Sequence, residues 1–259
     1  MDKLAELVKA SKVPDLDLNS LNADEAKIQA FVGALLAKGG AGELAELVIN
    51  NRLSVDNFPE LSADQAKQLA EALLAKGDEG GVDKLAELVK AGKVPDLDLN
   101  NLNADEAKIQ AFVGAVLKAG GEGELAGLLI GNKMPDLGLK SLTPAQSKQL
   151  AEALFAKSDE GGVDKLAELV KGDKVKLDAA QVPAFAGALL AKGDEGGVDK
   201  LAELVIADKV KLDAAQVPAF AEALLAKGDE GAGKLAELVI NNRLSVENFP
   251  TLTPDQATQ

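Results

Sequence analysis

Two short acidic segments carry the residue types that bind calcium in proteins. The sequence Asp-Leu-Asp-Leu-Asn occurs twice, and its oxygen-bearing side chains are Asp15, Asp17, Asn19, Asp96, Asp98 and Asn100. Alternating carboxylate and amide oxygens open a calcium-binding loop, which also needs a glycine at its sixth position and a glutamate at its twelfth. The first copy has Ser20 and Ala26 there, and the second copy also lacks both residues. The pattern favours a structural connector, with calcium binding as the alternative.

Another segment imitates a phosphate-binding loop. Residues 228–235 fit the pattern G-x-x-x-x-G-K, but Leu235 stands where a hydroxyl side chain should hold Mg²⁺. No strand is expected before the segment, and Asp229 and Glu230 would repel a triphosphate. We therefore interpret it as an ordinary loop.

The residues of most catalytic sites are missing. The chain has no His and no Cys, which excludes a Ser-His-Asp triad, a thiol nucleophile and the usual zinc sites. Carboxylates and lysines recur in every repeat, whereas an active site normally breaks the regularity at one place. The sequence predicts no catalytic residue and no cofactor, so we do not expect an enzyme.

The net charge limits the partners. There are 28 Lys and Arg against 42 Asp and Glu, which gives −14. A surface of this sign repels phosphate polyanions, so nucleic acid and anionic membranes are poor candidates. Acidic pairs such as Asp78-Glu79 and Asp159-Glu160 are expected at solvated loop tips. No signal peptide or membrane-spanning segment is visible, and a cytoplasmic location is the default expectation.

A repeated phrase, Leu-Ala-Glu-Leu-Val with one variant copy, organises the whole chain. Its copies begin at Leu4, Leu44, Leu85, Leu125, Leu166, Leu201 and Leu235. The steps of 34 to 41 residues between them are typical of a solenoid, in which each unit buries its apolar face against its neighbours. We predict an all-α solenoid of stacked two-helix repeats over residues 1–259.

Each repeat holds two expected helices. The first-type helix follows a capping box, in which a polar residue precedes Glu or Gln by three positions. These pairs are Asn22/Glu25, Ser62/Gln65, Asn103/Glu106, Thr143/Gln146, Asp178/Gln181, Asp213/Gln216 and Thr253/Gln256. Apolar residues follow at helical spacing, in stripes such as Ala66, Leu69, Ala70, Leu73 and Leu74, or Ile28, Phe31, Val32, Leu35 and Leu36, or Val182, Phe185, Ala186, Leu189 and Leu190.

The second-type helix carries the repeated phrase. Asp83, Asp164 and Asp199 are its candidate N-caps, and Gly39, Gly77 and Gly193 are candidate left-handed C-caps of the first-type helices. Neither helix is expected to exceed the ~12–15 residues below which an isolated helix is marginal. Stability must therefore come from packing between repeats. Pro183 and Pro218, four residues beyond the expected first helical position, have no explanation at this level.

The repeats divide the chain into an orphan second-type helix (1–13), six helix-pair units (22–252, with connectors) and a truncated first-type helix (253–259). Helices without a neighbour at both ends indicate either a fragment or head-to-tail self-association of the uncapped ends, and a head-to-tail contact makes rings or filaments. Near-identical blocks indicate recent duplication or an engineered origin.

Two family resemblances accompany these repeats. Leu142-Thr143-Pro144-Ala145-Gln146 and the loop at Gly161-Gly162 resemble the opening and loop of TAL-effector DNA-binding repeats, but the acidic loops oppose DNA and no binding residue is carried over. The Asp-Leu-Asp-Leu segments resemble a strand of leucine-rich repeats. That resemblance implies an α/β horseshoe, the second fold candidate, although segments such as Phe58-Pro59-Glu60-Leu61 break its alternation.

We expect a non-catalytic structural scaffold of helical repeats. The first alternative is a solenoid that binds a protein or peptide in its concave groove. Binding hot spots favour Trp, Tyr and Arg, and the chain has no Trp, no Tyr and two Arg residues, Arg52 and Arg243. The second alternative is a calcium-responsive module built on the Asp-Leu-Asp-Leu-Asn segments.

Overall fold

The computed structural model describes residues 1–14, 16–19, 24–193 and 196–249, and every regular element within them is a helix; no strand is formed there. The chain divides into two compact units, residues 1–141 and 142–259, each described by itself. The expected truncated helix 253–259 lies outside the described residues.

Two kinds of helix alternate along the chain. The first-type helices are α2 (Glu25–Ala37), α4 (Ala63–Ala75), α6 (Glu106–Ala119), α8 (Pro144–Ala156), α10 (Gln181–Ala191) and α12 (Val217–Leu225). The second-type helices are α1 (Asp2–Lys9), α3 (Ala41–Ile49), α5 (Gly81–Lys90), α7 (Glu122–Ile130), α9 (Gly162–Lys171), α11 (Gly197–Ile206) and α13 (Asp229–Ile240). The longest of these α-helices has 14 residues, so the expected shortness of the helices is confirmed.

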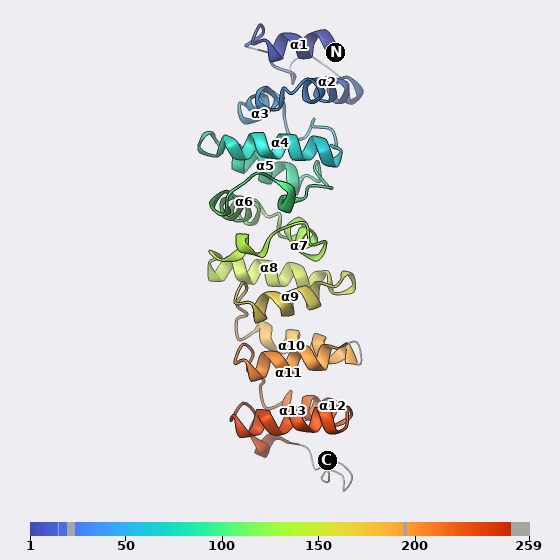
Figure 1. Ribbon diagram of the computed structural model, residues 1–259, viewed down its shortest axis with the longest axis vertical. Helices are drawn as coiled ribbons and strands as arrows, with labels where there is room; N and C mark the ends of the chain where they lie inside the picture. Colours follow the sequence, from blue (N-terminus) through green and yellow to red (C-terminus); the bar gives the residue numbers. More distant parts are fainter. Residues whose placement is uncertain (15, 20–23, 194–195, 250–259) are drawn as a thin grey trace. The chain divides into compact units, whose positions relative to one another are not determined.

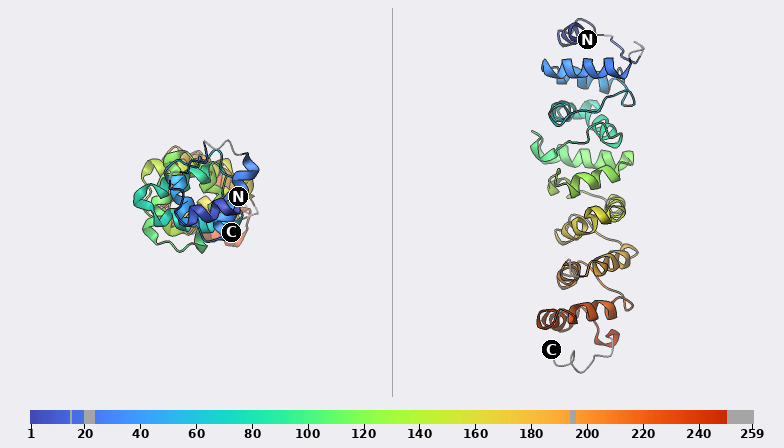
Figure 2. Two further views of the ribbon diagram at one scale, coloured as in Figure 1. Left: turned by 90° about the horizontal axis from the view of Figure 1, so that it is seen from above. Right: turned by 90° about the vertical axis from the view of Figure 1, so that its right-hand side faces the viewer.

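Within each unit the helices stack in chain order, from α1 to α7 in unit 1 and from α8 to α13 in unit 2 (Figures 1 and 2). Consecutive helices contact each other, as α4 contacts α5 and α10 contacts α11. Helices of the same type in neighbouring repeats also contact each other, as α3 contacts α5 and α9 contacts α11. The predicted all-α stack of helix pairs is confirmed in each unit.

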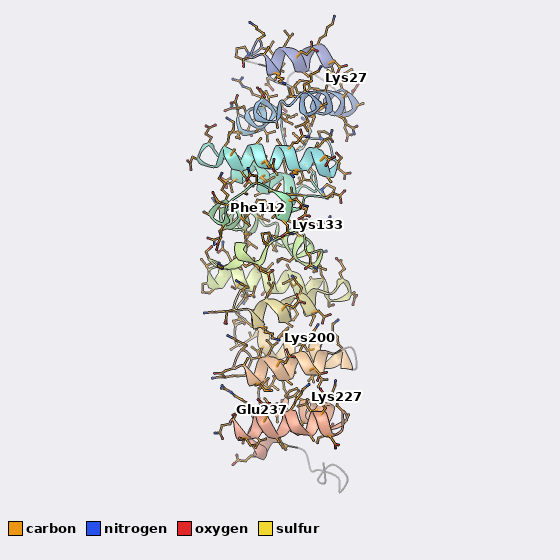
Figure 3. The ribbon with its side chains drawn as sticks, viewed as in Figure 1. Lys27, Phe112, Lys133, Lys200, Lys227 and Glu237 are labelled. Atoms are coloured by element: carbon orange, nitrogen blue, oxygen red, sulfur yellow. The ribbon has the colours of Figure 1, made fainter. Side chains whose placement is uncertain are left out.

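The apolar stripes form the core. All members of the stripes beginning at Ile28 and Ala66 are buried. In α10, Phe185, Ala186 and Leu189 are buried, while Val182 and Leu190 are only half-buried. Phenylalanines at equivalent places in four first-type helices have no exposed surface: Phe31, Phe112, Phe185 and Phe220. Each ring is therefore enclosed by neighbouring side chains of the core; Phe112 is labelled in Figure 3.

The connectors are turns rather than strands, so the α/β horseshoe is wrong for the described residues. In three of the longer connectors, one backbone hydrogen bond reaches the loop of the next repeat: Leu18 N donates to Arg52 O, Leu61 N to Lys93 O, and Leu99 N to Lys133 O. A single bond per repeat is too little for a ladder, which needs a run of them. Short 3₁₀ turns occupy Leu99–Asn101 (η2), Asp136–Leu139 (η3) and Val246–Asn248 (η6).

The capping boxes are confirmed in part. Ser62 and Thr143 form them with Gln65 and Gln146. Asp178 and Asp213 make the same reciprocal bonds with Gln181 and Gln216, ahead of the first full helical turn.

One predicted box is wrong within the described residues. Asp105, and not Asn103, is the N-cap of α6, and its side chain accepts the N–H of the residue three positions later. Asp24 caps α2 in the same way. Asn22 lies outside the described residues, as does the pair Thr253/Gln256.

The second-type helices start earlier than the sequence indicates. Asp83, Asp164 and Asp199 lie in the first turn, so they are not N-caps. The residue before each of α5, α9 and α11 is a glycine with positive φ, such as Gly80 at φ +92°. Gly39 and Gly193 have the expected left-handed backbone, whereas Gly77 begins a 3₁₀ turn, η1 (Gly77–Glu79), and does not.

The two prolines are explained by a late helix start. Pro183 is the third residue of α10 and Pro218 the second residue of α12. The first four N–H groups of a helix have no partner within the helix. Neither proline therefore removes a hydrogen bond of its helix.

Candidate functional site

The first acidic segment is tied to the next repeat by its asparagine. Asp17 Oδ1 accepts the Asn19 N–H at 2.9 Å. Asn19 Nδ2 donates to Asn51 O at 2.7 Å, and Asn19 Oδ1 accepts the Ser54 N–H at 2.9 Å. The amide oxygen that the calcium alternative would use thus accepts a backbone hydrogen bond. Asp15 lies outside the described residues.

The second copy repeats this arrangement. Asp98 Oδ1 accepts the Asn100 N–H at 2.9 Å, and Asn100 Nδ2 donates to Asn132 O at 2.7 Å. Asp96 lies apart from them and pairs with Lys133, whose Nζ is 3.4 Å from Oδ1. Among the described residues, no group of three or more carboxylates is placed to hold a metal ion. The two segments act as connectors between repeats.

The imitation of a phosphate loop is the start of a helix. Its interpretation as a loop is wrong from Asp229 onward, because α13 begins there. Lys234 Nζ lies 2.7 Å from Asp199 Oδ1 and 2.9 Å from Glu230 Oε1. The lysine is therefore held by carboxylates and not directed at an open loop.

The acidic tips are paired locally. Asp78-Glu79 and Asp159-Glu160 lie in the 3₁₀ turns η1 and η4 (Ser158–Glu160). Glu79 Oε2 is 3.3 Å from Lys76 Nζ, and Glu160 Oε2 is 3.0 Å from Lys157 Nζ. A lysine three residues earlier thus offsets part of the charge at each tip. The pair Asp194-Glu195 lies outside the described residues.

Two lysine–aspartate bridges in unit 2 each join three helical segments. Asp164 of α9 lies 2.8 Å from Lys192 Nζ, at the end of α10, and 2.7 Å from Lys200 Nζ of α11. One repeat later, Asp199 of α11 contacts Lys227 and Lys234 in the same way. Lys200 and Lys227 are labelled in Figure 3. Each carboxylate therefore joins one second-type helix to both helices of the next repeat.

The lysines change the protonation of these carboxyl groups. Hydrogen bonds from Lys227 and then Lys234 lower the pKa of Asp199 below its ordinary 3.8, against the opposing effect of partial burial. At Asp164, burial raises the pKa, but the bonds from Lys192 and Lys200 outweigh it and the net shift is downward. The pKa of Lys234 is raised by its hydrogen bonds to Asp199 and Glu230. Both carboxylates thus favour the folded state when ionised.

We expect the Asp199 bridge to make the stability of unit 2 sensitive to acid. Because the folded-state pKa is lowered, the bridge contributes stability above pH 3.8 and loses it as pH falls through the folded-state pKa. Asp199→Asn should cost about 1 kcal/mol at pH 7 after allowing for solvent screening, or about 2–4 °C in Tm. The measurement is thermal unfolding by circular dichroism from pH 7 to pH 2.

The difference between Asp199→Asn and the parent should vanish towards pH 2. The control is Asp159→Asn, which removes an exposed carboxylate from η4 and should change Tm by less than half as much. A constant difference between Asp199→Asn and the parent across the whole pH range would contradict the assignment.

Unit 1 contains a groove of about 560 Å³ between the α4–α5 junction and one side of α6. Small residues of α6 line it: Ala107, Ala111, Gly114 and Ala115. Asp78, Asp83 and Lys118 stand among its charged lining residues. The α6 residues give a shallow surface without a Trp, Tyr or Arg anchor, so the groove offers little that would hold a ligand tightly.

Sequence reasoning missed both the bridges and the groove. The sequence does contain a pattern that points to the bridges, because Asp164 and Lys192 recur 35 residues later as Asp199 and Lys227. The sequence also contains a pattern that points to the groove: alanines occur every four residues, at Ala107, Ala111 and Ala115, on the side of α6 opposite its apolar stripe.

No family model, curated protein or solved structure matches the chain. Over the described residues, none of the helices has the length and apolar character needed to cross a membrane.

Proposed function

We propose that the chain is a non-catalytic structural scaffold built of helical repeats. The observation that carries this proposal is the use of its polar side chains. The Asp164 and Asp199 bridges and the asparagines Asn19 and Asn100 all join one repeat to the next. The two bridges lie one repeat apart and the two asparagines lie two repeats apart, so these groups are spread along the stack and do not converge on one reactive centre.

The distribution of apolar side chains supports the same proposal. Among the described residues, the only large hydrophobic side chains that are exposed are Met1, Leu7 and Ile240. They lie in or beside α1 and α13, so the sides of the repeats carry no exposed Leu or Phe. Protein-binding surfaces usually show a contiguous apolar patch with large anchoring residues. A scaffold does not need one.

The two alternatives are less favoured. A protein- or peptide-binding solenoid would use a groove such as the one on α6, whose small side chains offer no anchor. A calcium-responsive module would need the oxygens of Asp17, Asn19 and Asp98, which accept backbone hydrogen bonds instead. Both functions stay predictions from the sequence.

Removal of one repeat tests the scaffold proposal. Deleting residues 175–209 joins Lys174 to Val210, which restores the local sequence because Lys209 precedes Val210 in the same context. If repeats are interchangeable, the shortened chain should keep the parent's helicity per residue, and its urea m-value should fall by about one seventh, in proportion to length. Circular dichroism during urea titration measures both quantities.

A deletion that is out of phase with the repeat provides the control. Removing residues 181–197 takes about half a repeat, because it deletes α10 and joins Ala180 to the second residue of α11. This shorter deletion should cost much more stability per residue removed. Loss of cooperative unfolding in the whole-repeat deletion would contradict a framework of equivalent units.

A further inference from the structure

The outer side of α1 is exposed where its internal copy is covered. Leu7 is 45% exposed, whereas Leu88, at the same place in α5, has no exposed surface. Leu4 is half-buried, and its counterpart Leu85 is fully buried. Because the two helices share the sequence Asp-Lys-Leu-Ala-Glu-Leu-Val-Lys, the difference comes from the neighbours: α5 is contacted by α3 and α4.

The outer side of α13 shows the complementary difference. Ile240 is 78% exposed, while its counterpart Ile49 in α3 is half-buried. Ala236 is exposed, whereas Ala45 has no exposed surface. In unit 1, α3 is covered on this side by α4 and α5. The side of α13 left open is therefore the side that α3 uses to contact the next repeat.

Unit 1 already contains the interface that these two sides would form. Residues 235–250 differ from residues 44–59 only in having Glu247 for Asp56, so α13 reproduces α3. Residues 1–32 differ from 82–113 at three positions, so α1 reproduces α5. Since α3 and α5 are in contact within the chain, the surfaces of α13 and α1 are complementary by repetition of an interface that is already formed.

We propose that α13 of one molecule packs against α1 of a second copy, head to tail, as α3 packs against α5. The contact is heterologous, since each molecule offers two different surfaces, so it continues into rings or filaments. α4, which contacts both α3 and α5, has no described counterpart at this junction. The association is therefore weaker than the internal stack. This assembly adds to the proposed scaffold and does not depend on it.

Two variants that each block one surface test the proposal. Leu7→Glu places a charge on the α1 surface, and Ile240→Glu places one on the α13 surface. Both side chains are exposed, so the variants should fold, which circular dichroism checks. Ala184→Glu, at an exposed position of α10, adds the same charge elsewhere and serves as the control.

Light scattering after size exclusion gives the mass at each concentration. For the parent and Ala184→Glu, the mass should rise from 26.7 kDa to at least twice that value between about 10 μM and about 1 mM. Each blocked variant alone should stay monomeric. An equimolar mixture of the two should form a dimer and stop there, because only one pair of surfaces remains open.

Three results would contradict the proposed contact between α13 and α1. A constant monomer mass for the parent over this range would overturn the proposal. Association of Leu7→Glu or Ile240→Glu alone would also overturn it, because that would require a surface to pair with itself or another contact. A mixture that remains monomeric while the parent associates would rule out the α13–α1 contact specifically.

Discussion

Gly162→Ala should destabilise unit 2 by about 3 kcal/mol. Gly162 is the first residue of α9, and a Cβ there would lie 2.0 Å from Leu154 O and 2.8 Å from Lys157 O. Both atoms belong to the backbone at the end of the preceding helix, so a side-chain movement cannot relieve the clash. Helix α9 would have to move away from α8, which it contacts. Urea unfolding followed by circular dichroism measures the loss.

The same substitution at another glycine is the matched control. Gly187 lies inside α10, and a Cβ at that position would meet nothing within 4 Å. Gly187→Ala should therefore stabilise the chain, by about 0.5–1 kcal/mol, because alanine loses less backbone entropy in a helix. If both variants changed stability in the same direction, close backbone contact at the α8–α9 junction would not be the reason for glycine at position 162.

Phe112→Ala should cost about 3–5 kcal/mol of unfolding free energy in unit 1. Phe112 has no exposed surface, and it belongs to α6, which packs on α5 and α7. Truncation would remove the contacts of the ring and leave a cavity between neighbouring repeats. Because helices of this length are marginal in isolation, the loss should weaken both repeats that share the side chain. Urea titration by circular dichroism measures the change.

Two further variants separate cavity formation from a peculiarity of one position. Phe112→Leu keeps most of the volume and should lose less than half as much as Phe112→Ala. Phe220→Ala removes the equivalent fully buried ring in unit 2 and should cost a similar amount. A loss below about 1 kcal/mol for Phe112→Ala would contradict the view that contacts between repeats supply the stability.

The fold could be predicted because the same apolar spacing recurs in every repeat. Ala66, Leu69 and Leu73 are buried as their spacing indicates, and a helix pair with one apolar face has few ways to bury it other than against the next pair. Helix starts were harder. Asn103 and Asp105 lie two residues apart and both have side chains that can cap a helix; the capping-box pattern favours Asn103, whereas Asp105 is the N-cap.

The predicted starts of the second-type helices are wrong for a related reason. Asp83 has the chemistry of an N-cap, but the helix starts two residues before it, at Gly81. A Cβ at Gly81 would lie 2.1 Å from Leu73 O, so close approach of two helix ends decides the start. That contact depends on tertiary packing and leaves no local signal beyond the glycine itself.

The polar contacts could be predicted only in part. The asparagines of the acidic segments were expected to be structural, and Asn19 and Asn100 do bond to the next repeat. The Asp199 bridge joins residues 28 and 35 positions apart. Such a separation becomes a contact only once the rise of the stack is known, so its geometry could not be read from the sequence.

We expect each repeat to be held by its neighbours and not by its own helices. The most direct test is the helicity of one repeat as an isolated peptide, residues 175–209, compared with the full chain by circular dichroism at 222 nm. We expect the peptide to be mostly unfolded at 25 °C, since its two helices lie below the length at which isolated helices are stable. A peptide with the same ellipticity per residue as the full chain would contradict the claim.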